Sequence, residues 1–158
     1  MSYQIREAKS EDMEGVWSLI QELAVFEKVP DAVEVTIEDL RRDGFQNPSL
    51  FNCYVAENDR HQIVGIALFY PRYSTWKGPV IHLEDLVVSE EYRGLGIGND
   101  LLKKVVGFAR DRKVKRVSWE VLDWNEPAIA FYESKGAHIM RDWNVVQLDK
   151  KGIDAFEI

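Results

Sequence analysis

Arg93-Gly94-Leu95-Gly96-Ile97-Gly98 joins an apolar stretch, Val80 to Val88, to a helical pattern that runs from Asn99 to Arg112. The apolar stretch is typical of a buried strand, so the glycines lie where a strand ends and a helix begins. Glycine accepts backbone conformations that turn successive N–H groups to one side, and the helix adds its positive N-terminal end. The segment therefore predicts an anion site that fits a diphosphate, to which Arg93 can add charge-assisted bonds. A simple turn into the helix is the alternative.

The segment does not match the patterns of two common phosphate loops. No Gly-Lys-Ser/Thr closes the segment, as a P-loop requires, and the G-x-G-x-x-G spacing of a dinucleotide site is absent. The segment also lies in mid-chain, after several expected strands. A nicotinamide-dependent oxidoreductase is therefore a remote alternative, and the pattern that the letters do match is Arg-x-x-Gly-x-Gly.

The hydrophobic pattern of the whole chain predicts one α/β domain over residues 1–158. Strands are expected over 3–8, 51–57, 63–70, 80–88, 115–122, 138–143 and 145–148, and helices over 12–26, 36–44, 99–112 and 125–136. Residues 71–79 are expected to form a loop. This order predicts a central, mixed, twisted sheet with helices on both faces.

Composition narrows the class of protein. The net charge of −7 disfavours a nucleic-acid partner and favours a cationic small substrate, although acidity also serves solubility alone. No apolar stretch is long enough to span a membrane, and the N-terminus lacks a signal-peptide pattern. A lone cysteine, Cys53, suits the reducing cytoplasm. The three histidines lack metal-ligand spacing, so no metal is expected.

Four further segments carry a specific resemblance. They are Glu22-Leu23-Ala24-Val25-Phe26-Glu27-Lys28, Tyr73-Ser74-Thr75-Trp76-Lys77-Gly78, the strand His82 to Val88, and Asn125 to Tyr132 followed by Lys135-Gly136-Ala137. With the glycine loop, they are similar to the diamine/polyamine branch of the GNAT N-acetyltransferases, the spermidine/spermine and thialysine acetyltransferases. The resemblance runs from about Ile5 to Trp143. It implies a GNAT fold, acetyl-CoA as the acetyl donor, a small primary amine as the acceptor, and a homodimer.

Acetyl transfer to an amine needs a base and an acid. An alkylammonium, with a pKa of about 10.4, must lose a proton before it can attack a thioester. The resemblance implies that Glu84 is this base, acting through a water, and its position in an apolar strand favours burial and a raised pKa. His82, on the same strand face, is the alternative base. By the same resemblance, Tyr132 is the acid that protonates the departing thiolate.

The resemblance also assigns contacts to acetyl-CoA. The backbone of Leu86, Val87 and Val88 is expected to bind it, followed by the loop Arg93 to Gly98. Asn125 and Tyr132 are expected to touch it from the later helix, and Asn125 is expected to cap that helix.

The acceptor amine is expected to contact five residues, which are Phe26, Lys28, Trp76, Glu84 and Asp85. Aromatic faces hold ammonium groups, although both aromatic residues could instead anchor loops. Strand alternation points Asp85 away from Glu84, so a shared role needs a bulge or a two-sided site. A structural hydrogen bond is the alternative role for Asp85.

Two positions depart from the polyamine relatives. Ser74 stands where they carry an acid, and Lys28 where they carry tyrosine. Both changes favour a thialysine- or lysine-like amino acid, whose carboxylate Lys28 or Lys77 can pair. A protein or peptide N-acetyltransferase and a catalytically silent acetyl-CoA-binding module are the other functions left open.

Overall fold

The computed structural model describes residues 2–158, which divide into two compact units. Unit 1 extends to Glu120, and unit 2 runs from Val121 to Ile158. The single domain expected over 1–158 stays a prediction. Among the residues described, no helix is long and apolar enough to cross a membrane.

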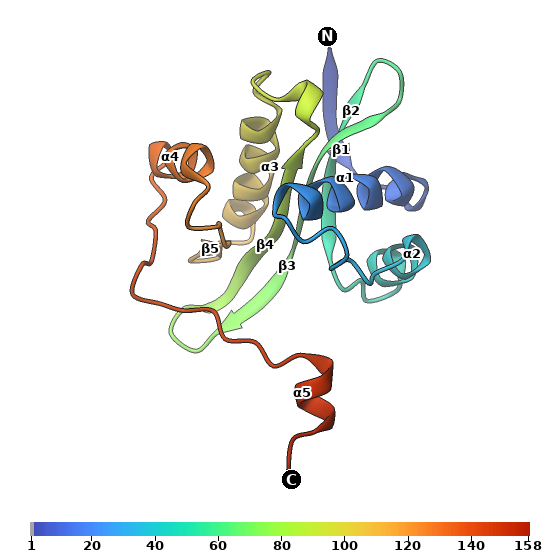
Figure 1. The fold of residues 1–158 in the computed structure, drawn as a ribbon. Coiled ribbons are helices and arrows are strands. Elements are labelled where there is room, and N and C mark those ends of the chain that lie inside the picture. The colour runs from blue at the N-terminus through green and yellow to red at the C-terminus, as the bar shows by residue number, and fades with distance from the viewer. Residues whose placement is uncertain (1) are drawn as a thin grey trace. The chain divides into compact units, whose positions relative to one another are not determined.

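Unit 1 is built on a five-stranded sheet (Figure 1). Its strands lie in chain order, and they are β1 (Tyr3–Glu7), β2 (Asn52–Asn58), β3 (Ile63–Ser74), β4 (Gly78–Val88) and β5 (Val117–Ser118). The first four pair antiparallel, whereas β5 runs parallel to β4. The sheet is therefore mixed, as the sequence predicts.

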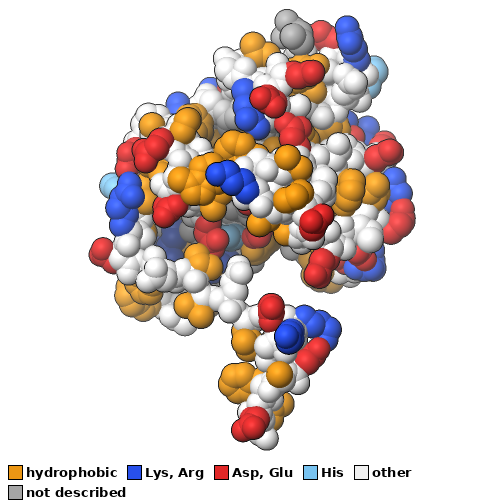
Figure 2. Space-filling view, in the orientation of Figure 1, with side chains coloured by type: hydrophobic (Ala, Val, Ile, Leu, Met, Phe, Trp, Pro, Cys, Tyr) orange, Lys and Arg blue, Asp and Glu red, His pale blue; other side chains and the backbone are white. Residues whose placement is uncertain are grey.

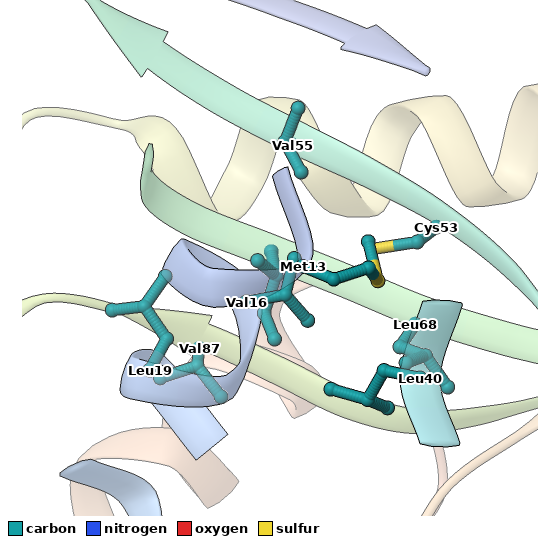
Figure 3. Packing of buried hydrophobic residues seen from close by; sticks show 9 residues of the cluster. Met13, Val16, Leu19, Leu40, Cys53, Val55, Leu68 and Val87 are labelled. Carbon is teal, nitrogen blue, oxygen red and sulfur yellow. The ribbon is translucent and has the colours of Figure 1, made fainter. Parts of the chain in front are cut away.

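Helices cover both faces of this sheet. A 3-10 turn η1 (Ser10–Asp12), α1 (Met13–Phe26) and α2 (Ile37–Phe45) lie on one face, and α3 (Ile97–Asp111) lies on the other after the turn η2 (Glu90–Tyr92). Figure 3 shows side chains of α1 and α2 packed against side chains of the sheet. The labelled residues of the helices are Met13, Val16, Leu19 and Leu40, and those of the strands are Cys53, Val55, Leu68 and Val87. Burying one such aliphatic side chain contributes about 1.5–3 kcal/mol.

The loop predicted over residues 71–79 is wrong, because β3 and β4 continue through it as a long hairpin. Pro71 and Pro79 suggested the loop, but neither disturbs the ladder. The Ile81 N–H donates to the Arg116 carbonyl on the β5 side, so the pair Pro71–Ile81 makes no hydrogen bond between β3 and β4. Because such pairs alternate along an antiparallel ladder, the pair Tyr73–Pro79 makes none either. Past Phe69, β3 has no β2 partner, so proline is tolerated on an open edge.

The strand predicted over 115–122 is reduced to the two residues of β5. They pair with Ile81 and His82 only. Two residues later β4 carries a bulge, which bends a strand and ends regular pairing on its outer side. The short β5 thus has a local cause in β4.

Unit 2 contains α4 (Glu126–Ser134) and α5 (Lys150–Asp154), and no strand is assigned in residues 121–158. The hairpin predicted over 138–148 is therefore wrong. An isolated two-stranded hairpin is marginally stable, and its apolar residues Val145 and Val146 are exposed. Figure 2 shows further hydrophobic side chains at the surface of the α5 segment, where Ile153 and Phe156 are exposed.

Candidate active site

A β-bulge in β4 organises the acidic residues. Leu68 of β3 pairs with Asp85 and Phe69 pairs with Leu83, so Glu84 is the extra residue. In a bulge, two consecutive residues oppose one residue of the partner strand. Glu84 and Asp85 therefore both lie opposite Leu68, on the face of the sheet that α1 covers. The bulge therefore places Asp85 on the same face as Glu84, which a shared role of the two residues requires.

Asp85 is the buried carboxyl of the pair. Its burial, followed by the charges of Glu84 and Glu27, raises the pKa of Asp85 to about 6. Burial also raises the pKa of Glu27, which follows the last residue of α1. The side chain of Glu84 is 51% exposed, so the prediction that Glu84 is buried in its strand is wrong. We call Glu27, Glu84 and Asp85 the acidic cluster.

Glu84 is held by neighbours on the hairpin. The Tyr70 hydroxyl donates to Glu84 Oε2 at 2.7 Å, and His82 Nε2 lies 3.6 Å from the same oxygen. His82 is 8% exposed, and its Nδ1 lies 3.1 Å from the Ser118 hydroxyl in β5. Both predicted bases, Glu84 and His82, therefore lie side by side on β4, and Tyr70 donates a hydrogen bond to Glu84.

The strand β4 presents free backbone groups on its outer edge. The Ser89 N–H donates to the Val64 carbonyl in β3, so by alternation the amides of Leu86 and Val88 point away from β3. From Leu83 onward, no strand within residues 2–158 pairs with that edge. Val87 differs, because its side chain is in the core and its backbone faces β3.

The glycine loop forms the expected turn into α3. Gly94 and Gly96 have φ values of 78° and 86°, and Gly96 is the N-cap residue of the helix. The first intrahelical bond runs from the Asp100 N–H to the Gly96 carbonyl. Within residues 2–158, the N–H groups from Gly94 to Asn99 have no acceptor. A row of free donors at a helix start, which includes those of Leu95, Ile97 and Gly98, is an anion-binding arrangement.

Arg93 ties this loop to its surroundings. Its Nε donates to the Val88 carbonyl at 3.1 Å, and its guanidinium lies 5.5 Å from the centre of the Phe26 ring. Glu22 Oε1 accepts the Glu90 N–H at 2.8 Å and lies 3.9 Å from Arg93 Nη2. Phe26, predicted to line the acceptor pocket, thus packs on the loop predicted to bind the donor.

Lys28 and Trp76 lie in two different turns of unit 1. Lys28 follows α1 with a φ of 65°, and its N–H donates to Val25 while the next N–H, of Val29, donates to Ala24. This is the helix-ending arrangement that usually takes glycine. Trp76 is 84% exposed at the tip of the β3–β4 hairpin, where Ser74 Oγ accepts the Trp76 N–H.

Asn125 and Tyr132 belong to unit 2. The Asn125 side chain accepts the Ala128 N–H at 3.4 Å, which confirms the predicted helix cap of α4. Tyr132 is buried beside Phe131, and this burial raises the pKa of its hydroxyl. Their contacts with acetyl-CoA stay predictions.

Sequence reasoning missed Glu27 and Tyr70 as members of the site. Glu27 stands in the segment that carried the resemblance, between Phe26 and Lys28, and its charge was the available signal. Tyr70 carried no signal, because its contact with Glu84 depends on the register of β3 against β4.

Known proteins are similar to this chain over most of its length. The model of the acetyltransferase (GNAT) family matches residues 11–137. A thialysine N-epsilon-acetyltransferase from Bos taurus is 44% identical over 140 residues, which cover 84% of this chain and 82% of that protein. Spermidine/spermine N(1)-acetyltransferase-like protein 1 from Homo sapiens is 40% identical over 141 residues, 85% of this chain and 20% of that protein. An L-ornithine N5-acetyltransferase from Arabidopsis thaliana is 34% identical over 126 residues, 79% of this chain and 52% of that protein.

Solved structures share the fold. An integron cassette protein of V. cholerae superposes with a TM-score of 0.79 and 23% identity, over 98% of this chain and 96% of that one. An aminoglycoside acetyltransferase from a soil metagenome gives a TM-score of 0.72 and 19% identity, over 92% and 97%.

Proposed function

The chain belongs to the acetyltransferase (GNAT) family and is an acetyltransferase, and we propose that it transfers the acetyl group of acetyl-CoA to a primary amine of a small molecule. One observation carries the proposal. Along β4, the acidic cluster at Glu84 and Asp85 is followed by the loop of free amides that begins at Gly94. An anionic donor and a cationic acceptor would then meet at the end of one strand.

The residues of unit 1 fit acetyl-CoA. The free N–H groups from Gly94 to Asn99 would hold the diphosphate, and a Cβ added at Gly94 would meet nothing within 4 Å, so the backbone is open to approach. The outer edge of β4, at Leu86 and at the Val88 N–H, would pair with the amides of the pantetheine arm. Bound acetyl-CoA supplies an acetyl group activated as a thioester.

The acidic cluster would receive the amine. Its three carboxyl groups attract an alkylammonium, and the half-exposed Glu84 carboxylate, which precedes the loop along β4, would take up the proton that the nitrogen must lose. A general base of this kind contributes about 10²- to 10⁴-fold to the rate. Trp76 and Phe26 would contribute aromatic faces.

Tyr132 would return a proton to the departing thiolate. Because burial raises the pKa of its hydroxyl, Tyr132 stays protonated at neutral pH, as a proton donor must be. The match of the segment Asn125 to Tyr132 to the family pattern supports this role and an additional contact of Asn125 with the cofactor.

The acceptor we favour is an amino acid with a distal amine. Lys28 stands directly after Glu27, and Lys77 lies in the hairpin turn, and the ammonium group of either lysine would pair with a carboxylate on the substrate. Relatives named for thialysine and for L-ornithine, both amino acids, support this choice. A diamine or polyamine is the second acceptor class, favoured by the relative named for spermidine and spermine.

A screen for thiol release from acetyl-CoA tests the proposal. The acceptors are lysine, thialysine, ornithine, putrescine, spermidine and a peptide with a free N-terminus. We expect faster release with the three amino acids than with the polyamines, and none above background with the peptide. Acetylation of the peptide alone, or of no acceptor, would overturn the proposal, and equal rates with both small-amine classes would remove the amino-acid preference.

Single substitutions separate the catalytic roles. We expect Glu84→Gln to lower kcat by about 10²- to 10⁴-fold with acetyl-CoA binding intact, because an amide accepts no proton at neutral pH. His82→Gln is the matched control for the alternative base, and Tyr132→Phe tests the acid. A larger loss in His82→Gln than in Glu84→Gln would transfer the role of base to His82.

We propose further that the protein is a homodimer of the cytoplasm. The exposed apolar residues of unit 2, which include Trp143 and Phe156, support an interface, and the single cysteine supports a reducing compartment. Sedimentation of the full chain measures the first property.

A further inference from the structure

The cross-strand pair Tyr70–His82 lies beside the bulge that carries Glu84. The two rings are 5.5 Å apart, on adjacent residues of β3 and β4. From this pair, Tyr70 reaches Glu84 Oε2 at 2.7 Å, whereas His82 Nε2 remains at 3.6 Å. Tyr70 therefore makes the shortest contact with the proposed base.

The two oxygens of the Glu84 carboxylate are not equivalent. Oε2 faces Tyr70 and His82, while Oε1 has no partner among residues 2–158. A half-exposed glutamate on an unpaired bulge residue has several rotatable bonds and loses orientation easily. Because proton transfer depends on the position of the base, one fixed oxygen matters for the rate.

We infer that Tyr70 is a positioning residue: its hydroxyl holds Oε2 of Glu84 and so reserves Oε1 for the proton of the acceptor amine or of an intervening water. This inference rests on the proposed function, since it assigns a partner to the proposed base. It adds a residue for which the sequence carried no signal.

The charges around this pair come from several elements. Arg72 lies on β3, His82 and Asp85 on β4, Glu27 at the end of α1, and Glu120 beyond β5. Burial and the bond to Glu84 raise the pKa of Tyr70 to about 12. Tyr70 therefore remains the donor throughout the pH range in which an acetyltransferase is assayed.

The test compares Tyr70→Phe with Tyr73→Phe, an exposed tyrosine on the same strand. We expect Tyr70→Phe to lower kcat roughly tenfold to a hundredfold, the range for one hydrogen bond to a charged group, with the KM for acetyl-CoA unchanged. Tyr73→Phe should behave as the wild type. An unchanged kcat in Tyr70→Phe would overturn the inference.

A double-mutant cycle shows whether Tyr70 acts through Glu84. In the Glu84→Gln background, Tyr70→Phe should lower kcat by less than threefold, because the carboxylate that Tyr70 positions is absent. A full additive loss would contradict the inference. If Tyr70→Phe does not fold, Glu84→Asp breaks the same bond by withdrawing the carboxylate, and should reproduce the loss of kcat with the KM for acetyl-CoA unchanged. Failure of Glu84→Gln to slow acetyl transfer would instead count against the proposed role of the base.

Discussion

Two groups of carboxylates in unit 1 differ in their partners. In the arginine-paired cluster (Arg6, Asp12 and Glu57), Arg6 binds Asp12 through both terminal nitrogens, at 2.7 and 2.9 Å, and Glu57 through Nε at 2.6 Å. In the acidic cluster, none of the ion pairs within residues 2–158 joins Glu27 or Asp85 to an arginine or lysine.

The pKa values follow these partners. The hydrogen bonds of His61 and then Arg6 lower the pKa of Glu57 to about 2. Burial by itself would raise the pKa of Asp12, but the bonds from Arg6 and the Lys9 N–H outweigh it and lower that pKa. Burial instead raises the pKa of Asp85 to about 6. A buried carboxylate that is paired with a cation contributes to the fold. A buried carboxylate without a cation lowers stability, and a cationic ligand can supply the missing partner.

Arg6→Met should produce the largest change in stability. It leaves Asp12, 8% exposed, without its cation, and we expect the free energy of unfolding to fall by about 3 kcal/mol, at the low end for a broken buried pair because Arg6 is itself 25% exposed. Urea unfolding at pH 7 measures this. Arg42→Met, which removes exposed ion pairs on α2, is the control and should cause no measurable loss. Equal losses in both variants would erase the contrast between the two clusters.

Asp85→Asn should raise the stability of the protein, whereas Arg6→Met lowers it. A carboxyl whose pKa is higher in the folded than in the unfolded state loses stability as the pH rises from about 4 to about 6, so the cost is complete above pH 6. We expect the variant to be about 2 kcal/mol more stable than the wild type at pH 8 and equal to it near pH 4. Its KM for the amine should rise several-fold.

Asp12→Asn provides the matched comparison for Asp85→Asn. Because the pKa of Asp12 is lowered, its stabilisation is present above the unfolded pKa and is lost as the pH falls through the folded one. This variant should therefore be less stable than the wild type at pH 8, with a shrinking difference toward low pH. The same sign in both variants at pH 8 would show that the two clusters do not differ.

Lys28→Gly should give the smallest change in stability, and it also tests whether Lys28 contributes to the preference for one acceptor amine over another. Lys28 holds a φ of 65°, which costs a side chain about 1 kcal/mol, and glycine removes that cost. We expect thermal unfolding to show a gain of about 1 kcal/mol, while Lys28→Ala keeps the strain and gains nothing. Both variants should lose preference for lysine over putrescine, because both lose the ammonium. A retained preference would exclude Lys28 from recognition of the substrate carboxylate.

The elements predicted correctly are those specified within a few consecutive residues. The helix predicted over 36–44 begins at a capping box, in which the Asp39 N–H donates to Thr36 Oγ1, and Asn125 caps α4 as expected. The glycine loop likewise joins β4 to α3. Pro71 and Pro79 misled the prediction because their effect on a strand depends on which neighbour the missing N–H would have faced.

The sequence by itself determined the order of the elements from β1 to α4, the glycine turn at Arg93 to Gly98 and the candidate acids Glu84 and Asp85, because helix caps, left-handed glycines and charges are properties of short segments. Only the tertiary structure decided that Glu84 and Asp85 share one face, that Glu27 joins them and that Tyr70 holds Glu84. The physical reason is register: one extra residue in β4 reverses the side to which the following residues point, and no local pattern announces it.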